Sequence, residues 1–154
     1  PAPVHEEDEV AVSGTTQHGP EASPRILVFS TINISDPGID LAGSRHLPYP
    51  ATVQTMAVPC SSGLKPSWLL HALQSGFDGV VIASDGEECS YLPDCAERTA
   101  HLVTRAQELM REVGIEPQRL KMAAVCSVCA EPFVNYMREF SEVLKRLNAS
   151  TSAA

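Results

Sequence analysis

Four short apolar runs, spaced along the chain, each predict a β-strand. The runs are rich in valine, isoleucine and other apolar residues, and turn-forming residues lie between them. They cover residues Arg25–Phe29, Val53–Val58, Gly79–Ala83 and Leu120–Val125. Among them Gly79–Ala83, which reads GVVIA, carries the strongest strand signal in the chain.

Between these runs the apolar residues recur at helical spacing, which predicts amphipathic helices. The predicted helices cover residues Asp40–Leu47, Ser67–Gln74, Asp94–Val113 and Phe133–Leu147. Pro66 suits the first turn of a helix, while Gly76 and Gly114 suit the position just after a last turn. The stretch Ser35-Asp36-Pro37-Gly38 has the composition of a turn.

Strands that alternate with helices indicate crossover connections between parallel strands. We therefore expect one doubly wound α/β domain over residues 25–148, with a parallel sheet of four or five strands and helices on both faces. Residues 1–24 are rich in acidic, Ser, Thr, Gly and Pro residues and are expected to form a disordered acidic tail. Residues 149–154 are expected to fray.

The composition argues against several classes of protein. The net charge of −8 leaves no basic surface to neutralise phosphates, so we expect no nucleic-acid binding. No apolar run approaches the roughly 20 residues that span a bilayer, and the first residues show no signal-peptide pattern. We therefore expect a cytoplasmic protein without direct membrane insertion. The sequence also lacks a glycine-rich nucleotide loop, a catalytic triad and a metal-ligand spacing among its five histidines.

Five cysteines carry the candidate chemistry, and four of them follow predicted strands. The carboxyl ends of parallel strands lie along one edge of a sheet, where open α/β folds bind ligands. Thiols from distant segments would converge there, as a zinc ion or an iron–sulfur cluster requires. The predicted metal ligands are Cys60, Cys89, Cys126 and Cys129, with Cys95 in reserve.

Plainer interpretations of the same cysteines stay open. Cys60 suits a small buried apolar residue at a strand end, and Cys89 lies in an acidic loop of the kind that is usually solvated. The segment Cys126-Ser127-Val128-Cys129 has the CxxC spacing of zinc sites, iron–sulfur clusters and dithiol redox sites alike. A thioredoxin-like enzyme would carry this motif after its first strand rather than its last, so dithiol exchange is the weaker interpretation.

A series of landmarks recurs in the order and spacing of a known family. They are Arg25–Phe29, Asp40–Gly43, Arg45, Leu47, Tyr49, Pro50, Val58, Cys60, Ser62, Gly63, Gly76–Val81, Cys89–Leu92, Arg98, Gly114–Pro117, Arg119 and Leu120. Over residues 25–147 the chain thereby resembles the delta subunit of methyl-viologen-reducing hydrogenase, which is an iron–sulfur subunit that docks on heterodisulfide-reductase-type flavoproteins. The resemblance implies a flavodoxin-like fold, a cysteine-held [2Fe-2S] cluster, and electron transfer between a hydrogenase or formate dehydrogenase and the flavoprotein partner.

The chain departs from this family at several cysteine positions. Where the family has a cysteine-rich segment after the first strand, this chain has Ser30, Thr31 and Ile34. After the third strand, Ser84-Asp85 occupies the region of a glycine–cysteine pair. The inherited set of four thiolates is therefore broken.

Two hypotheses follow for what we expect to be a non-catalytic subunit of a cytoplasmic redox complex. Only Cys60 and Cys89 occupy family cysteine positions. Either Cys126 and Cys129 rebuild the cluster with them, and the chain relays electrons, or the cluster is lost and the chain is a docking or structural subunit. A zinc site and thiol exchange are the lesser alternatives.

Overall fold

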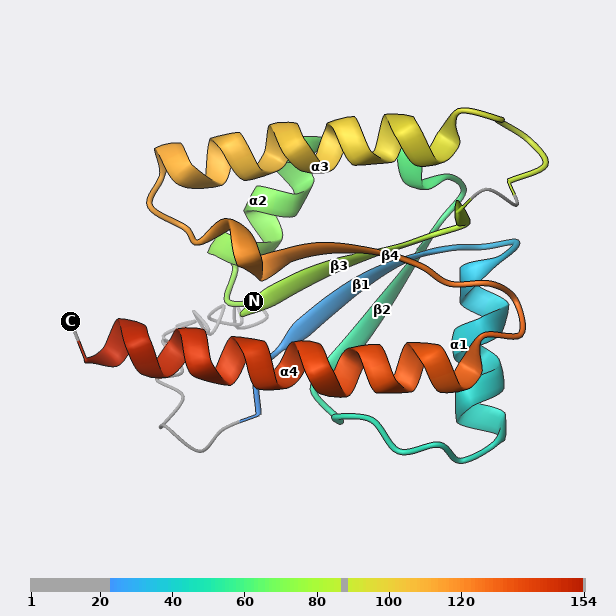
Figure 1. Ribbon diagram of the computed structural model, residues 1–154, viewed down its shortest axis with the longest axis horizontal. Helices are drawn as coiled ribbons and strands as arrows, with labels where there is room; N and C mark the ends of the chain where they lie inside the picture. Colours follow the sequence, from blue (N-terminus) through green and yellow to red (C-terminus); the bar gives the residue numbers. More distant parts are fainter. Residues whose placement is uncertain (1–22, 87–88, 154) are drawn as a thin grey trace, which may run out of the picture.

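A computed structural model describes residues 23–86 and 89–153 of the chain. Its centre is an all-parallel, four-stranded sheet with the order β2-β1-β3-β4, which matches the first four positions of the flavodoxin-like order (Figure 1). The strands are β1 (Ile26–Thr31), β2 (Val53–Val58), β3 (Gly79–Ser84) and β4 (Leu120–Ala124). The predicted α/β fold is confirmed, and each strand begins and ends within two residues of its prediction.

Within the described residues, α-helices cover both faces of the sheet, with α1 and α4 on one face and α2 and α3 on the other (Figure 1). The helices are α1 (Ser35–Ser44), α2 (Pro66–Gln74), α3 (Cys95–Glu112) and α4 (Ala130–Ser152), with 3-10 turns η1 (Ser61–Gly63) and η3 (Pro117–Arg119). In this part of the chain, no helix combines the length and the apolar composition that a bilayer span requires.

The central strands β1 and β3 are buried along their whole length, which explains their continuous apolar sequence. Their side chains enter two different cores, because successive residues of a strand point to opposite faces. The residues in the core beneath α1 and α4 are Ile26, Val28, Val81 and Ala83. The residues in the core beneath α2 and α3 are Leu27, Phe29, Val80 and Ile82.

Two glycines end helices as the sequence predicts. Gly76 follows α2 with φ of 97°, and Gly114 follows α3 with φ of 76°, both in the left-handed region that glycine adopts without strain. Pro66 is the first residue of α2, where its missing amide hydrogen costs no helical hydrogen bond.

The predicted turn at Ser35–Gly38 is wrong, because these residues form the first turn of α1. Pro37 is compatible with this position, since the amide groups of a first helical turn have no partner within the helix. The Ser35 hydroxyl ties the start of α1 to the sheet: it accepts a hydrogen bond from the Thr31 amide and donates one to the Ala83 carbonyl. Tertiary contacts therefore start this helix earlier than local composition suggests.

The closing helix is longer than predicted. Helix α4 spans Ala130–Ser152, three residues more at its start and five more at its end than the prediction. The expected fraying of residues 149–154 is therefore wrong as far as the end of α4. Side-chain contacts explain the extension, since Asn148 donates a hydrogen bond to Asp78 and accepts one from Arg119.

The predicted acidic tail, residues 1–24, falls largely outside the described residues, which exclude 1–22. Pro24, the last residue of that predicted tail, is instead buried, and its carbonyl accepts a hydrogen bond from the Thr52 hydroxyl. Pro24 therefore belongs to the folded domain.

Helix α1 approaches the loop before α4 so closely that Gly38 has no room for a side chain. A Cβ atom there would collide with the backbone carbonyl oxygen of Cys126, which moves only with the main chain. We expect Gly38→Ala to lower the free energy of unfolding by about 1–3 kcal/mol, the range for an overpacked interior. Urea titration followed by circular dichroism measures this change.

Gly43→Ala is the matched control in the same helix, because a Cβ atom at Gly43 meets no atom within 4 Å. It should leave the free energy of unfolding unchanged or raise it by up to about 1 kcal/mol, since alanine favours a helix over glycine. Equal effects of the two substitutions would contradict a close approach at Gly38.

Candidate functional site

The strand order reverses between β1 and β3, because β2 pairs with the outer side of β1 and β4 with the outer side of β3. Open α/β sheets bind ligands in the crevice at such a point, beyond the carboxyl ends of the strands. A pocket of about 140 Å³ lies there, lined by Asn33, Pro59, Cys60, Asp85, Cys89 and Tyr91. The structure thus brings two of the predicted ligands, Cys60 and Cys89, to one pocket.

Cys60 has a second thiol beside it. Its Sγ atom lies 3.8 Å from Cys95 Sγ and 3.0 Å from the Ser62 hydroxyl. Cys60 directly precedes η1 and Cys95 is the first residue of α3, so the contact joins two separate segments. The Cys95 side chain is buried, and the Ser61 hydroxyl lies 3.6 Å from its sulfur.

The hydrogen bonds around Cys95 favour its thiolate form. Burial alone would raise the pKa of this thiol, because it disfavours the charged form. Hydrogen bonds with Ser61, Cys60 and Ser62 outweigh burial, so that the pKa lies below its usual value. The thiolate is the form that attacks disulfides and binds metals.

Oxygen atoms rather than sulfur atoms lie at the carboxyl ends of β1 and β3. Thr31 donates a hydrogen bond to the buried carboxylate of Asp85, and its hydroxyl lies 3.0 Å from the Ser35 hydroxyl. Ser30 donates a hydrogen bond of 2.7 Å to Asp36. Across residues 23–86 and 89–153, no buried side-chain nitrogen or oxygen lacks a partner, so this network is closed.

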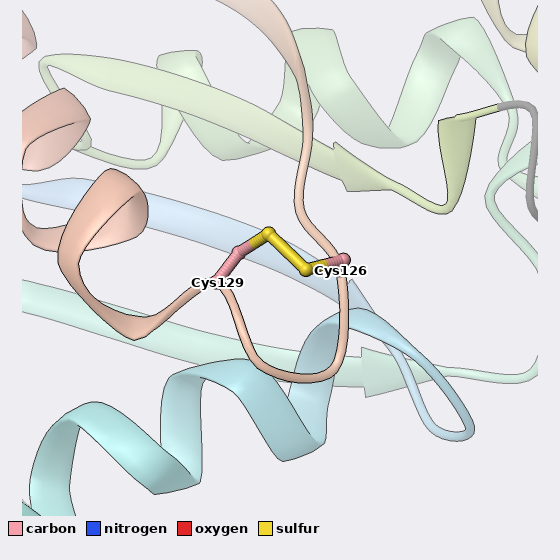
Figure 2. Close-up of a disulfide and its surroundings, with 2 residues drawn as sticks. All are labelled: Cys126 and Cys129. Atoms are coloured by element: carbon pink, nitrogen blue, oxygen red, sulfur yellow. A yellow bond between two sulfur atoms is a disulfide. The ribbon is translucent and has the colours of Figure 1, made fainter.

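The CxxC motif forms a disulfide between Cys126 and Cys129, whose Cα atoms are 5.0 Å apart (Figure 2). The disulfide closes the loop that connects β4 to α4, and Cys129 caps the start of that helix. The hypothesis of dithiol exchange expects a disulfide at this position. Whether this bond exchanges with other thiols stays a prediction.

The two groups of cysteines lie on different sides of the sheet. The Cys126 carbonyl packs against α1, and Cys129 contacts the core beneath α1 and α4. Cys95 begins α3 over the opposite face, where it meets Cys60. The preceding strands β2 and β4 are also the two edges of the sheet, three strand spacings or about 14 Å apart.

Four-thiolate ligation by Cys60, Cys89, Cys126 and Cys129 does not fit this arrangement. Metal–sulfur bonds of about 2.3 Å require the sulfur atoms to surround one centre closely. In the part of the chain that the structure describes, no three His, Cys, Asp or Glu side chains gather as a metal site. A cluster held by these four cysteines stays a prediction that requires the loops to rearrange.

Sequence reasoning missed the Cys60–Cys95 pair and the Thr31–Asp85 hydrogen bond. The shared sheet edge is visible in the sequence, but the strand order and the face that each helix covers decide which side chains meet there. One signal was available: Cys95 lies close to the expected start of a helix that follows the third strand.

Comparison with known proteins identifies the family. A family model described as methyl-viologen-reducing hydrogenase, delta subunit, matches residues 26–148. The iron-sulfur subunit of the F420-non-reducing hydrogenase of Archaeoglobus profundus is 28% identical over 132 residues, which cover 82% of this chain and 93% of that subunit. The vhu iron-sulfur subunit of the F420-non-reducing hydrogenase of Methanopyrus kandleri is 35% identical over 109 residues, which cover 70% of this chain and 82% of that subunit.

A much longer protein also contains a related segment. It belongs to the ferredoxin:CoB-CoM heterodisulfide reductase of Methanosarcina mazei, and one subunit of that reductase is 30% identical over 112 residues, which are 70% of this chain and 14% of that protein. The match to the family model extends over nearly the whole described domain. The chain therefore belongs to the family of the methyl-viologen-reducing hydrogenase delta subunit.

Proposed function

We propose that this chain is a docking subunit of a multi-subunit redox complex. It joins a hydrogenase to a heterodisulfide-reductase-like flavoprotein, without the cysteine-held cluster that the family resemblance implies. Relatives named as subunits of hydrogenases and of a heterodisulfide reductase support a place in such a complex. The observation that carries the loss of the cluster is the hydrogen bond between Thr31 and Asp85.

Thr31 and Asp85 both lie in segments where the family resemblance places cysteines. Thr31 belongs to the segment after the first strand, and Asp85 to the replaced glycine–cysteine region after the third. In this chain the two side chains are buried and bonded to each other. Buried polar groups need partners, and this pair supplies them without a bound ion. The exchange of two thiols for a mutually bonded hydroxyl and carboxylate supports a domain that folds without the cluster.

Exposed apolar side chains mark the same edge of the sheet as a docking surface. Ile32 follows β1, Tyr91 follows β3 and Val128 follows β4, and these side chains are 50%, 76% and 73% exposed. Exposed apolar and aromatic residues of this kind are typical of protein interfaces. We call these three residues the docking edge. Its occupant is the flavoprotein partner, because the Methanosarcina mazei reductase protein carries a segment like this chain within itself.

An electron relay through a [2Fe-2S] cluster is the second candidate, and the pocket shared by Cys60 and Cys89 favours it. The Cys95 thiol lies beside Cys60 and adds a third sulfur. A fourth cysteine donor would have to come from Cys126 or Cys129, after reduction of their disulfide. A bound cluster would supply one-electron transfer in the cytoplasmic complex.

Charged substitutions at the docking edge test the docking proposal. We expect Tyr91→Glu combined with Val128→Glu to weaken binding to the flavoprotein partner by a factor of about ten or more, because two carboxylates would be buried in an apolar contact. Calorimetric titration of the purified proteins measures this affinity.

Val113→Glu is the matched control for the docking edge. Val113 is 51% exposed, but it lies at the end of α3, at the opposite edge of the sheet. This variant should bind the flavoprotein partner as tightly as the unaltered chain does. Equal weakening by both sets of substitutions, or by neither, would rule out docking through this edge.

Iron analysis separates docking from the electron relay. The chain, purified without oxygen and incubated with ferrous iron and sulfide, should hold well below one iron, because its four proposed ligands lie apart. About two irons and two sulfides per chain, lost in the Cys126→Ala variant, would overturn the proposal and establish the relay. The Ser127→Ala variant, within the same loop, controls for disturbance of that loop.

Thr31→Val tests the network that replaces the thiols. The substitution keeps the shape of the side chain but leaves the Asp85 carboxylate without its hydroxyl partner. We expect a loss of about 1–3 kcal/mol in the free energy of unfolding, the cost of an unsatisfied buried group. Thr55→Val, on the exposed β2, should stay within about 0.5 kcal/mol. If both variants match the unaltered chain in urea titration, the Thr31–Asp85 bond does not stabilise the fold.

A further inference from the structure

The pair of thiols between η1 and the start of α3 takes no part in docking. We propose that Cys60 and Cys95 form a reversible redox dithiol, in which Cys60 reacts first with a small-molecule disulfide and Cys95 then closes an intramolecular disulfide. The proposal goes beyond the docking function and does not depend on it.

The distance between the two sulfur atoms suits this reaction. They are 3.8 Å apart, whereas the sulfur atoms of a disulfide are about 2.05 Å apart. Side-chain rotation can supply an approach of less than about 2 Å, so the two segments need little backbone movement. The pair therefore sits close to bonding geometry while both thiols are free.

The two thiols differ in their access to solvent. Cys60 is half-buried and lines the pocket at the carboxyl edge, so a small molecule in the pocket meets its sulfur. Cys95 is 1% exposed and is reached only past Cys60 and its loop. This difference assigns the order of reaction: Cys60 meets the outside reagent, and Cys95 responds from within.

Hydroxyl groups hold Cys95 ready for that response. Ser61 lies 3.6 Å from the Cys95 sulfur and is itself 3.0 Å from the Thr99 hydroxyl. Thr99 in turn donates a hydrogen bond to the Cys95 backbone carbonyl, one helical turn away. The hydroxyls fix the sulfur and stabilise its thiolate, which is the nucleophile in thiol–disulfide exchange.

The exchange proceeds in two balanced steps. The Cys60 thiolate attacks one sulfur of a small disulfide RSSR, which forms a Cys60–SR mixed disulfide and releases one thiolate RS⁻. The Cys95 thiolate then attacks the Cys60 sulfur, which forms the Cys60–Cys95 bond and releases the second RS⁻. Overall the two cysteines lose two electrons and two protons, and RSSR is reduced to two thiols.

Oxidised glutathione is the probe for this site. The chain is fully reduced, exposed to oxidised glutathione, alkylated at its remaining thiols and cleaved with chymotrypsin. Cleavage after Trp68 and Tyr91 places Cys60, Cys89 and Cys95 on separate peptides for mass spectrometry. We expect a crosslink between the Cys60 and Cys95 peptides, with Cys89 alkylated.

Single substitutions assign the two roles. In Cys95→Ser, glutathione should accumulate on Cys60, since nothing displaces it. In Cys60→Ser, the modification of Cys95 should be at least about tenfold slower than that of Cys60 in the unaltered chain, because a buried thiol is shielded. Cys89→Ser is the matched control on the same pocket, and its crosslinking should be unchanged.

The peptide map of the unaltered chain decides the proposal even if a variant fails to fold. A stable glutathione adduct on Cys60 with Cys95 still free would overturn it. So would a crosslink of Cys60 to Cys89, which would show that the pocket rather than the buried contact selects the partner.

Discussion

The parallel pairing of β1 with β3 determines which groups meet at the carboxyl edge of the sheet. The pairing runs from Ile26 with Gly79 to Ser30 with Ala83, between strands that are buried on both faces. Thr31 and Asp85 come just after the paired residues, and their hydrogen bond follows from that register. Because a slip of one residue would turn each side chain to the other face, burial enforces the register and the register places the polar network.

The same pair of strands also holds α4 in place. Gly79 leaves a space that the side chains of Phe140 and Leu144 fill so tightly that a Cβ atom would be under 3 Å from both. The position of α4 in turn fixes Cys129 at its start, on the side of the sheet away from Cys95. Sulfur chemistry is therefore divided between two faces, and a polar network bonded through oxygen lies between them.

The sequence predicts the strands of this domain well because strand formation here depends on local apolar runs that are buried on both faces. It does not predict α1, since Pro37 and Gly38 read as a turn and the helix start depends on contacts of Ser35 with β1 and β3. For the site, the shared edge follows from parallel strands, but the sequence does not reveal which face each connecting helix covers. That choice separates Cys126 from Cys60 and brings in Cys95 instead.

The direction of α4 bears on how this domain is attached to other chains. The helix runs back from the carboxyl edge to the opposite edge, where Asn148 meets Asp78, and the chain enters β1 from that same side after Pro24. Both points of covalent attachment therefore lie away from the pocket. A neighbouring domain linked at either point leaves the reactive edge open to a third component. This geometry accommodates a long host polypeptide such as the Methanosarcina mazei relative, in which the related segment is 14% of the protein.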